Sequence, residues 1–194
     1  MNVMVIYDHP WEGSYCNAVL QQVIQGLKRG GHHYDVLDLQ KDGFDPIMRA
    51  ADLALYSKGQ YSDPKVGEYQ SRIEKADHLF FIFPIWWEVM PAYLKGFCDK
   101  VFLNNWAYEK TGLMPKGKLT FIKGATVITT MGTPGILYRL KYGNAIEKAF
   151  NVGTLKFCGI KKVKWINLGR VDGVTQKKRE KWLSDIGNYA CALR

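Results

Sequence analysis

The chain has 194 residues, of which 47% are apolar and 13% aromatic, and this is enough for one domain with a packed core. The composition excludes a disordered chain, a collagen-like fibre and a disulfide-stapled mini-protein. The net charge of +9 is uneven: residues 1–100 carry 10 basic and 13 acidic side chains, whereas residues 101–194 carry 17 and 5. A basic half favours an anionic partner: a nucleic acid, an acidic membrane surface or a phosphorylated small molecule.

The start of the chain lacks the features of a signal peptide, because no basic segment precedes the apolar run and Asp8 and His9 end it. The longest apolar run, residues 79–87, is interrupted by Pro84 and is too short to span a bilayer. The four cysteines are scattered without a Cys-x-x-Cys spacing, which favours reduced thiols. We therefore expect a cytoplasmic protein without membrane insertion.

The chain opens with a short apolar run at residues 2–7, which predicts a strand buried on both faces. Ser14 is a suitable N-cap for a helix that ends at Gly30-Gly31. Further strands are predicted at residues 34–39, 78–84, 125–130 and 163–168. Helices are predicted at residues 64–76, 91–103, 144–157 and 175–193, with a short one within 40–62. Residues 104–123 and 131–135 read as irregular segments.

Strands and helices alternate five times, which predicts a parallel sheet with helices on both faces. Five such units in 194 residues fit a flavodoxin-like doubly wound five-stranded sheet of order 2-1-3-4-5, as a single domain over residues 1–194. Ligands of such sheets bind beyond the carboxyl ends of the strands. The loops at 8–17, 84–91 and 130–142 should therefore form one site.

The first loop, residues 8–17, joins a strand to a helix N-terminus, where free N–H groups and the helix dipole attract anions. Ser14, Asn17 and His9 add hydrogen-bonding side chains, so the loop has the chemistry of a phosphate site. It lacks the glycines of a Walker or dinucleotide-binding loop. This loop alone is also explained by an ordinary helix cap beside a solvated histidine.

The other two loops add aromatic and glycine residues. Trp86 and Trp87 follow a strand and can stack on a flat heterocycle, although a role in capping the sheet explains them equally well. Gly132 and Gly135 allow a ligand to approach the backbone, although an ordinary Gly/Pro turn has the same composition.

Taken together, these residues resemble the flavodoxin-like NAD(P)H:quinone oxidoreductase family, over nearly the whole chain. The family includes bacterial modulator-of-drug-activity proteins and ancillary subunits of potassium-efflux systems. The most specific similarity is Phe83-Pro-Ile-Trp-Trp followed by Pro91-Ala-Tyr-Leu-Lys-Gly. His9-Pro10 and Ser14-x-x-Asn17 resemble its flavin-phosphate loop, and Trp106-Ala-Tyr108 resembles its substrate-lining aromatic triplet.

The resemblance implies a bound FMN (or FAD), NAD(P)H as co-substrate, a quinone-like acceptor and a homodimer, with hydride transfer in a ping-pong order and no metal. It implies a catalytic role for Tyr138 and a substrate pocket at Glu88 and Tyr108. The implied flavin contacts are His9, Ser14, Tyr15, Cys16, Asn17, Pro84, Ile85, Trp86, Trp87, Thr130, Met131, Gly132, Thr133 and Gly135.

Three alternatives remain from the sequence. A flavodoxin-type electron carrier shares the fold, but its docking face is typically acidic, whereas this chain is basic. A regulatory subunit that docks on a membrane transporter fits the basic half. A nucleic-acid-binding module is disfavoured because no recognition motif accompanies the lysine clusters, so no nucleic-acid partner is expected and the lysines are predicted to steer NAD(P)H.

Overall fold

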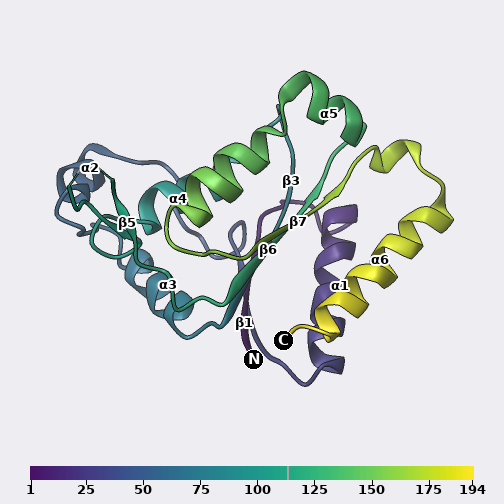
Figure 1. Cartoon of the computed structure of the whole chain (residues 1–194), viewed down its shortest axis with the longest axis horizontal. Coiled ribbons are helices and arrows are strands. Elements are labelled where there is room, and N and C mark those ends of the chain that lie inside the picture. Colours follow the sequence, from purple (N-terminus) through teal and green to yellow (C-terminus); the bar gives the residue numbers. More distant parts are fainter. Residues whose placement is uncertain (113) are drawn as a thin grey trace.

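The structure is a computed structural model that describes residues 1–112 and 114–194 (Figure 1). Its main sheet contains five parallel strands in the order β2-β1-β3-β6-β7, which confirms the predicted flavodoxin-like order. The strands are β1 (Asn2–Tyr7), β2 (His33–Asp38), β3 (His78–Pro84), β6 (Gly124–Thr130) and β7 (Val163–Leu168). The side chains of β3 and β6 are buried throughout, as the apolar runs in the sequence require.

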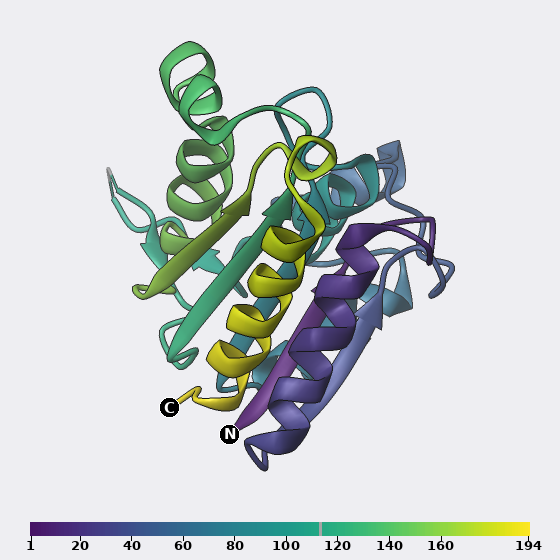
Figure 2. The same cartoon turned by 90° about the vertical axis from the view of Figure 1, so that its right-hand side faces the viewer.

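Helices cover both faces of the sheet. On one face, α1 (Tyr15–Arg29) and α6 (Gln176–Cys191) lie side by side (Figure 2). The other face carries α3 (Pro64–Glu74), α4 (Ala92–Val101) and the π-helix η1 (Glu147–Lys156). Each face thus has its own hydrophobic core. No helix in the described part of the chain is both long and apolar enough to cross a membrane.

Three local features differ from the predicted elements. Residues predicted as part of a loop form α5 (Gly135–Tyr142), which starts after Pro134 and ends at Gly143, where φ is +62°. Its apolar side chains are mostly exposed and only Tyr138 is buried, so the sequence shows no periodic core stripe there. The segment predicted as irregular contains a small antiparallel pair, β4 (Tyr108–Glu109) and β5 (Lys116–Gly117). A short 3-10 helix, η2 (Val171–Gly173), follows β7.

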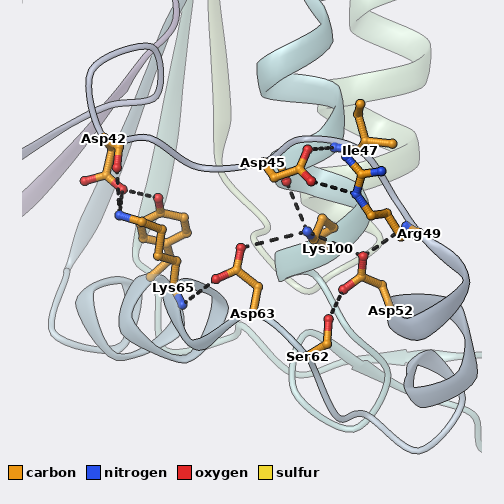
Figure 3. Close-up of polar contacts among 10 residues, drawn as sticks. Asp42, Asp45, Ile47, Arg49, Asp52, Ser62, Asp63, Lys65 and Lys100 are labelled. Carbon is orange, nitrogen blue, oxygen red and sulfur yellow. Dashed lines mark hydrogen bonds and ion pairs between the residues drawn. The ribbon is translucent and has the colours of Figure 1, made fainter.

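A buried lysine fastens the segment that contains α2 (Ala50–Tyr56) to the rest of the protein (Figure 3). The Nζ atom of Lys100, on α4, donates to the carbonyl oxygen of Asp45 at 3.0 Å. The same Nζ lies 3.5 Å from Oδ2 of Asp52 and 3.9 Å from Oδ2 of Asp63. Asp52 also accepts a hydrogen bond from Ser62. The segment is therefore held against α4 by a paired, buried charge.

Candidate functional site

A cleft of about 250 Å³ lies beyond the carboxyl ends of β1, β3 and β6. Parallel pairing places Pro84 opposite Thr130, so the loops that follow these two strands leave the sheet together. The structure thus brings the first, second and third predicted loops to one site. Ten of the expected flavin contacts line the cleft, namely His9, Ser14, Tyr15, Cys16, Pro84, Ile85, Trp86, Thr130, Met131 and Gly132.

The N-terminus of α1 forms one wall of the cleft. The hydroxyl of Ser14 caps the helix by accepting a hydrogen bond from the backbone N–H of Asn17 at 3.1 Å. Within the described chain, the backbone N–H groups of Tyr15 and Cys16 have no acceptor. These donors and the helix dipole favour an anion at this wall, and a phosphate group has the required charge and oxygen acceptors.

A buried hydroxyl lies under the same loop. The phenol oxygen of Tyr7 is sealed from solvent and has no hydrogen-bond partner in the described residues. Burial raises the pKa of this phenol, so it remains a neutral group. An unpaired buried hydroxyl costs free energy in a folded protein. The phenol lies near the side chains of Ser14 and Asn17, beneath the loop and outside the residues that line the cleft.

His9 is held as a neutral hydrogen-bond donor. Its Nδ1 accepts a hydrogen bond from the backbone N–H of Trp11 at 3.0 Å, which places the ring proton on Nε2. Burial lowers the pKa of this imidazole and disfavours its charged form. The ring lies edge-on to Trp86, with 5.7 Å between centroids. Nε2–H is thus available to a ligand oxygen in the cleft.

Asp8 connects two of the loops and was not predicted to have a role. Its Oδ1 accepts from Nε2 of Gln40 at 2.7 Å and its Oδ2 from the backbone N–H of Leu94 at 2.8 Å. The second contact caps α4, whose own first residues provide no capping side chain. Burial raises the pKa of Asp8 despite these bonds. The sequence does contain a signal for this role of Asp8, because its carboxylate directly follows a buried strand.

The second loop ends in a strained two-residue turn. Trp86 and Val89 exchange two backbone hydrogen bonds, of 3.0 and 3.1 Å, around Trp87 and Glu88. These two central residues have φ values of 49° and 66°, in the left-handed region that usually requires glycine or asparagine. The Tyr138 hydroxyl stabilises the turn by donating to the carbonyl of Glu88 at 2.8 Å. Strain of this kind is common at binding sites.

Four of the expected flavin contacts are not among the residues that line the cleft, and their role stays a prediction. Asn17, Trp87, Thr133 and Gly135 do not line the cleft, and the side chain of Trp87 is 97% exposed. A carboxylate oxygen of Glu88 is buried without a hydrogen-bond partner in the described chain.

Tyr138 and Tyr108 are also not among the residues that line the cleft. The ring of Tyr138 is fully buried, and its hydroxyl donates to Glu88 and accepts from the backbone N–H of Ile146 at 3.0 Å. These two hydrogen bonds position the turn, and a catalytic role for Tyr138 stays a prediction. Tyr108 lies in a different cavity, between α4, η1 and the β4–β5 pair, where its hydroxyl is 3.2 Å from that of Tyr56.

Sequence reasoning missed three residues that line the cleft: Trp11, Val171 and Asp172. Val171 and Asp172 belong to η2, which follows β7 and folds over the end of the sheet. Topology offered a signal for them, because the loop after the fifth parallel strand leaves from the same edge as the others.

The sheet order and the cleft define a doubly wound α/β protein with an anion-binding helix terminus and an aromatic wall at the carboxyl edge. Comparison with known families agrees: the family described as having a flavodoxin-like fold matches residues 1–190. The chain belongs to this flavodoxin-like family, and its relatives include NAD(P)H:quinone oxidoreductases, as the sequence resemblance indicated.

Individual relatives extend this result. NAD(P)H dehydrogenase (quinone) 1 of Cavia porcellus is 32% identical over 176 residues, which are 80% of this chain and 64% of that protein. The crystal structure of Smu.1420 from Streptococcus mutans UA159 is 32% identical, with a TM-score of 0.86 and full coverage of both chains. NAD(P)H:quinone oxidoreductase from Methanothermobacter marburgensis is 28% identical, with a TM-score of 0.87 over 98% of this chain and 96% of that one. The matched part of the present chain thus spans less than two thirds of the length of the Cavia porcellus protein.

Proposed function

We propose that the protein is a flavin-dependent NAD(P)H oxidoreductase that reduces quinones or related electron-poor acceptors by hydride transfer in a ping-pong order. The observation that carries this proposal is the carboxyl-edge cleft, where an unpaired helix N-terminus faces an aromatic wall. The quinone-reductase relatives support the same reaction class. FMN (or FAD), when bound, supplies the chemistry of accepting a hydride from NAD(P)H and passing it on.

Different residues of the cleft would bind the phosphate and the ring system of the flavin. Ser14, the N–H groups of Tyr15 and Cys16, and Nε2–H of His9 would hold the phosphate. On the other side of the cleft, Pro84, Ile85 and Trp86 would lie against the ring system. The exposed backbone of Gly132 allows close approach on the third loop.

The surface beside the cleft favours the expected homodimer. The side chains of Trp87, Ile136 and Leu140 are 97%, 73% and 77% exposed. Tyr138 lies on α5 with Ile136 and Leu140, and its hydroxyl bonds the turn that contains Trp87. Exposed apolar side chains of this size commonly mark an interface. A second copy of the chain would cover them and close the substrate side of the site, and size-exclusion chromatography with light scattering measures the mass directly. A cytoplasmic location stays a prediction.

The cofactor experiment tests the proposal most directly. The purified protein should show a flavin absorption spectrum or take one up from added FMN or FAD, and release followed by chromatography identifies which. The flavin-loaded protein should then oxidise NAD(P)H continuously when a quinone is present. Binding of neither flavin would refute the proposal, and flavin binding without turnover would favour a flavodoxin-type electron carrier.

A pair of variants tests the aromatic wall. Trp87→Ala should leave the free energy of unfolding nearly unchanged, because the side chain touches little of its own chain, while it weakens binding of flavin or acceptor. Trp86→Ala is the paired variant: because Trp86 lines the cleft beside His9, its loss should weaken flavin binding more than the loss of Trp87 does. If Trp87→Ala destabilises the fold as much as it weakens ligand binding, Trp87 has a packing role instead.

A further inference from the structure

A second cavity, of about 510 Å³, lies at the opposite edge of the sheet from the cleft. Its walls come from the amino ends of β3, β6 and β7 and from the last turn of α6. In Figure 2 this edge is the lower end of the sheet, near both chain ends. The proposed oxidoreductase chemistry makes no use of it.

The charged side chains that line this cavity are all basic. Four basic residues line it and no Asp or Glu does: Lys123, Lys162, Lys164 and Arg194. Lys123 is paired with Asp77 at 2.9 Å, and the ammonium of Lys164 lies 3.6 Å from the ring centroid of Tyr189. Within the described residues, Lys162, Lys164 and Arg194 make no ion pair. No acidic side chain of the described residues therefore neutralises their positive charge.

The cavity wall also contains a buried polar side chain. His78 is only 7% exposed, and its Nε2 is 2.9 Å from the hydroxyl of Thr126, which in turn is 2.9 Å from the hydroxyl of Tyr189. Nδ1 has no partner among the described residues. Burial lowers the pKa of this imidazole to about 4, so the ring is neutral. When Tyr189 donates to Thr126 and Thr126 donates to Nε2, the ring proton lies on Nδ1.

We propose that this cavity binds a small phosphate-bearing anion. Phosphate oxygens accept hydrogen bonds from ammonium groups and from a neutral imidazole N–H, and both kinds of donor are present here. The volume exceeds that of a single phosphate and falls in the range of pockets for nucleotide-sized ligands. This inference is independent of the proposed oxidoreductase function, because it rests on residues at the other edge of the sheet.

The test is an NMR titration of the full chain with pyrophosphate, which locates binding by amide shifts. We expect shifts at residues 123–125 and 162–164 that occur separately from those at the α1 N-terminus. The double variant Lys162→Glu/Lys164→Glu should raise the dissociation constant at least about ten-fold, the effect of losing a hydrogen bond to a charged group. The matched control is Lys58→Glu/Lys177→Glu, which makes the same charge change at exposed lysines that line neither cavity and should leave the constant unchanged.

Two further arms identify the source of the phosphate. Adenosine diphosphate tests a free ligand, and vesicles of phosphatidylcholine with phosphatidylserine test a lipid headgroup. If the protein binds one of these two probes and the cavity variant abolishes that binding, the result supports the site and identifies the source of the phosphate. The proposal is overturned if no probe shifts residues 123–125 and 162–164, or if the cavity variant and the control lose binding equally, since the lysines would then act only as general surface charge.

Discussion

The Tyr138→Phe variant separates a positioning role from a catalytic one. The substitution keeps the buried ring and removes its hydroxyl. In the wild type this hydroxyl donates to the carbonyl of Glu88 at 2.8 Å and accepts from the N–H of Ile146 at 3.0 Å. Both partners then lose a hydrogen bond, the N–H of Ile146 in a buried position and the carbonyl of Glu88 in a partly buried one. At roughly 1 to 3 kcal/mol for each unsatisfied buried group, the expected loss of stability is about 3 kcal/mol.

The assays for this variant are urea denaturation and thermal unfolding, together with steady-state kinetics of the flavin-loaded protein. For a chain of this size, about 3 kcal/mol corresponds to a melting temperature lower by roughly 6 to 12 °C. Because the hydroxyl stabilises the strained turn, we expect weaker binding of flavin or acceptor, while turnover at saturation changes little. Unchanged stability together with a large fall in turnover would refute the positioning role and restore the catalytic one that the family resemblance implied.

Three other predictions concern buried ionisable groups. Burial lowers the pKa of His78 from 6.5 to about 4, so in acid the unfolded chain binds more protons than the folded chain. Stability should therefore fall by about 2 to 3 kcal/mol between pH 7.5 and pH 4.5 in urea titrations, and an equally steep fall in His78→Gln would contradict this. Because the pKa of Asp8 is raised, the folded chain binds more protons than the unfolded chain in the acid range. The stability of the wild type relative to Asp8→Asn should therefore decrease as pH rises through that range. A difference that stays constant with pH would show that the pKa of the carboxyl is the same in both states. Lys100→Met should lower the free energy of unfolding by about 3 kcal/mol, because it leaves buried carboxylates without their cation. The control Lys95→Met, at an exposed ion pair, should lower it by less than about 1 kcal/mol. Equal losses of stability would argue against the network in Figure 3.

The strands were predictable because burial on both faces leaves a simple pattern. The apolar runs at 2–7 and 78–84 end almost where β1 and β3 end, and the parallel order then fixes which loops meet. The same reasoning located most of the cleft, since a loop that follows a parallel strand opens on one edge.

The missed features depend on contacts that are distant in sequence. Asp8 acts through Leu94, 86 residues away, and the partners of Tyr138 are a carbonyl and an N–H from two other segments. The turn at Trp87 and Glu88 was hidden for another reason: its sequence contains neither glycine nor asparagine, the usual markers of left-handed φ. Such a turn is stable only because tertiary hydrogen bonds hold it.

The buried strand β3 determines how far the two ends of the sheet can influence each other. His78 begins it at the basic cavity and Pro84 ends it at the cleft, and seven residues in extended conformation span roughly 20 Å. Through solvent, that separation exceeds the screening length of about 8 Å in physiological salt. An anion that arrives at one end therefore leaves the electrostatic potential at the other almost unaltered, and communication between the ends would require a shift of the strand itself.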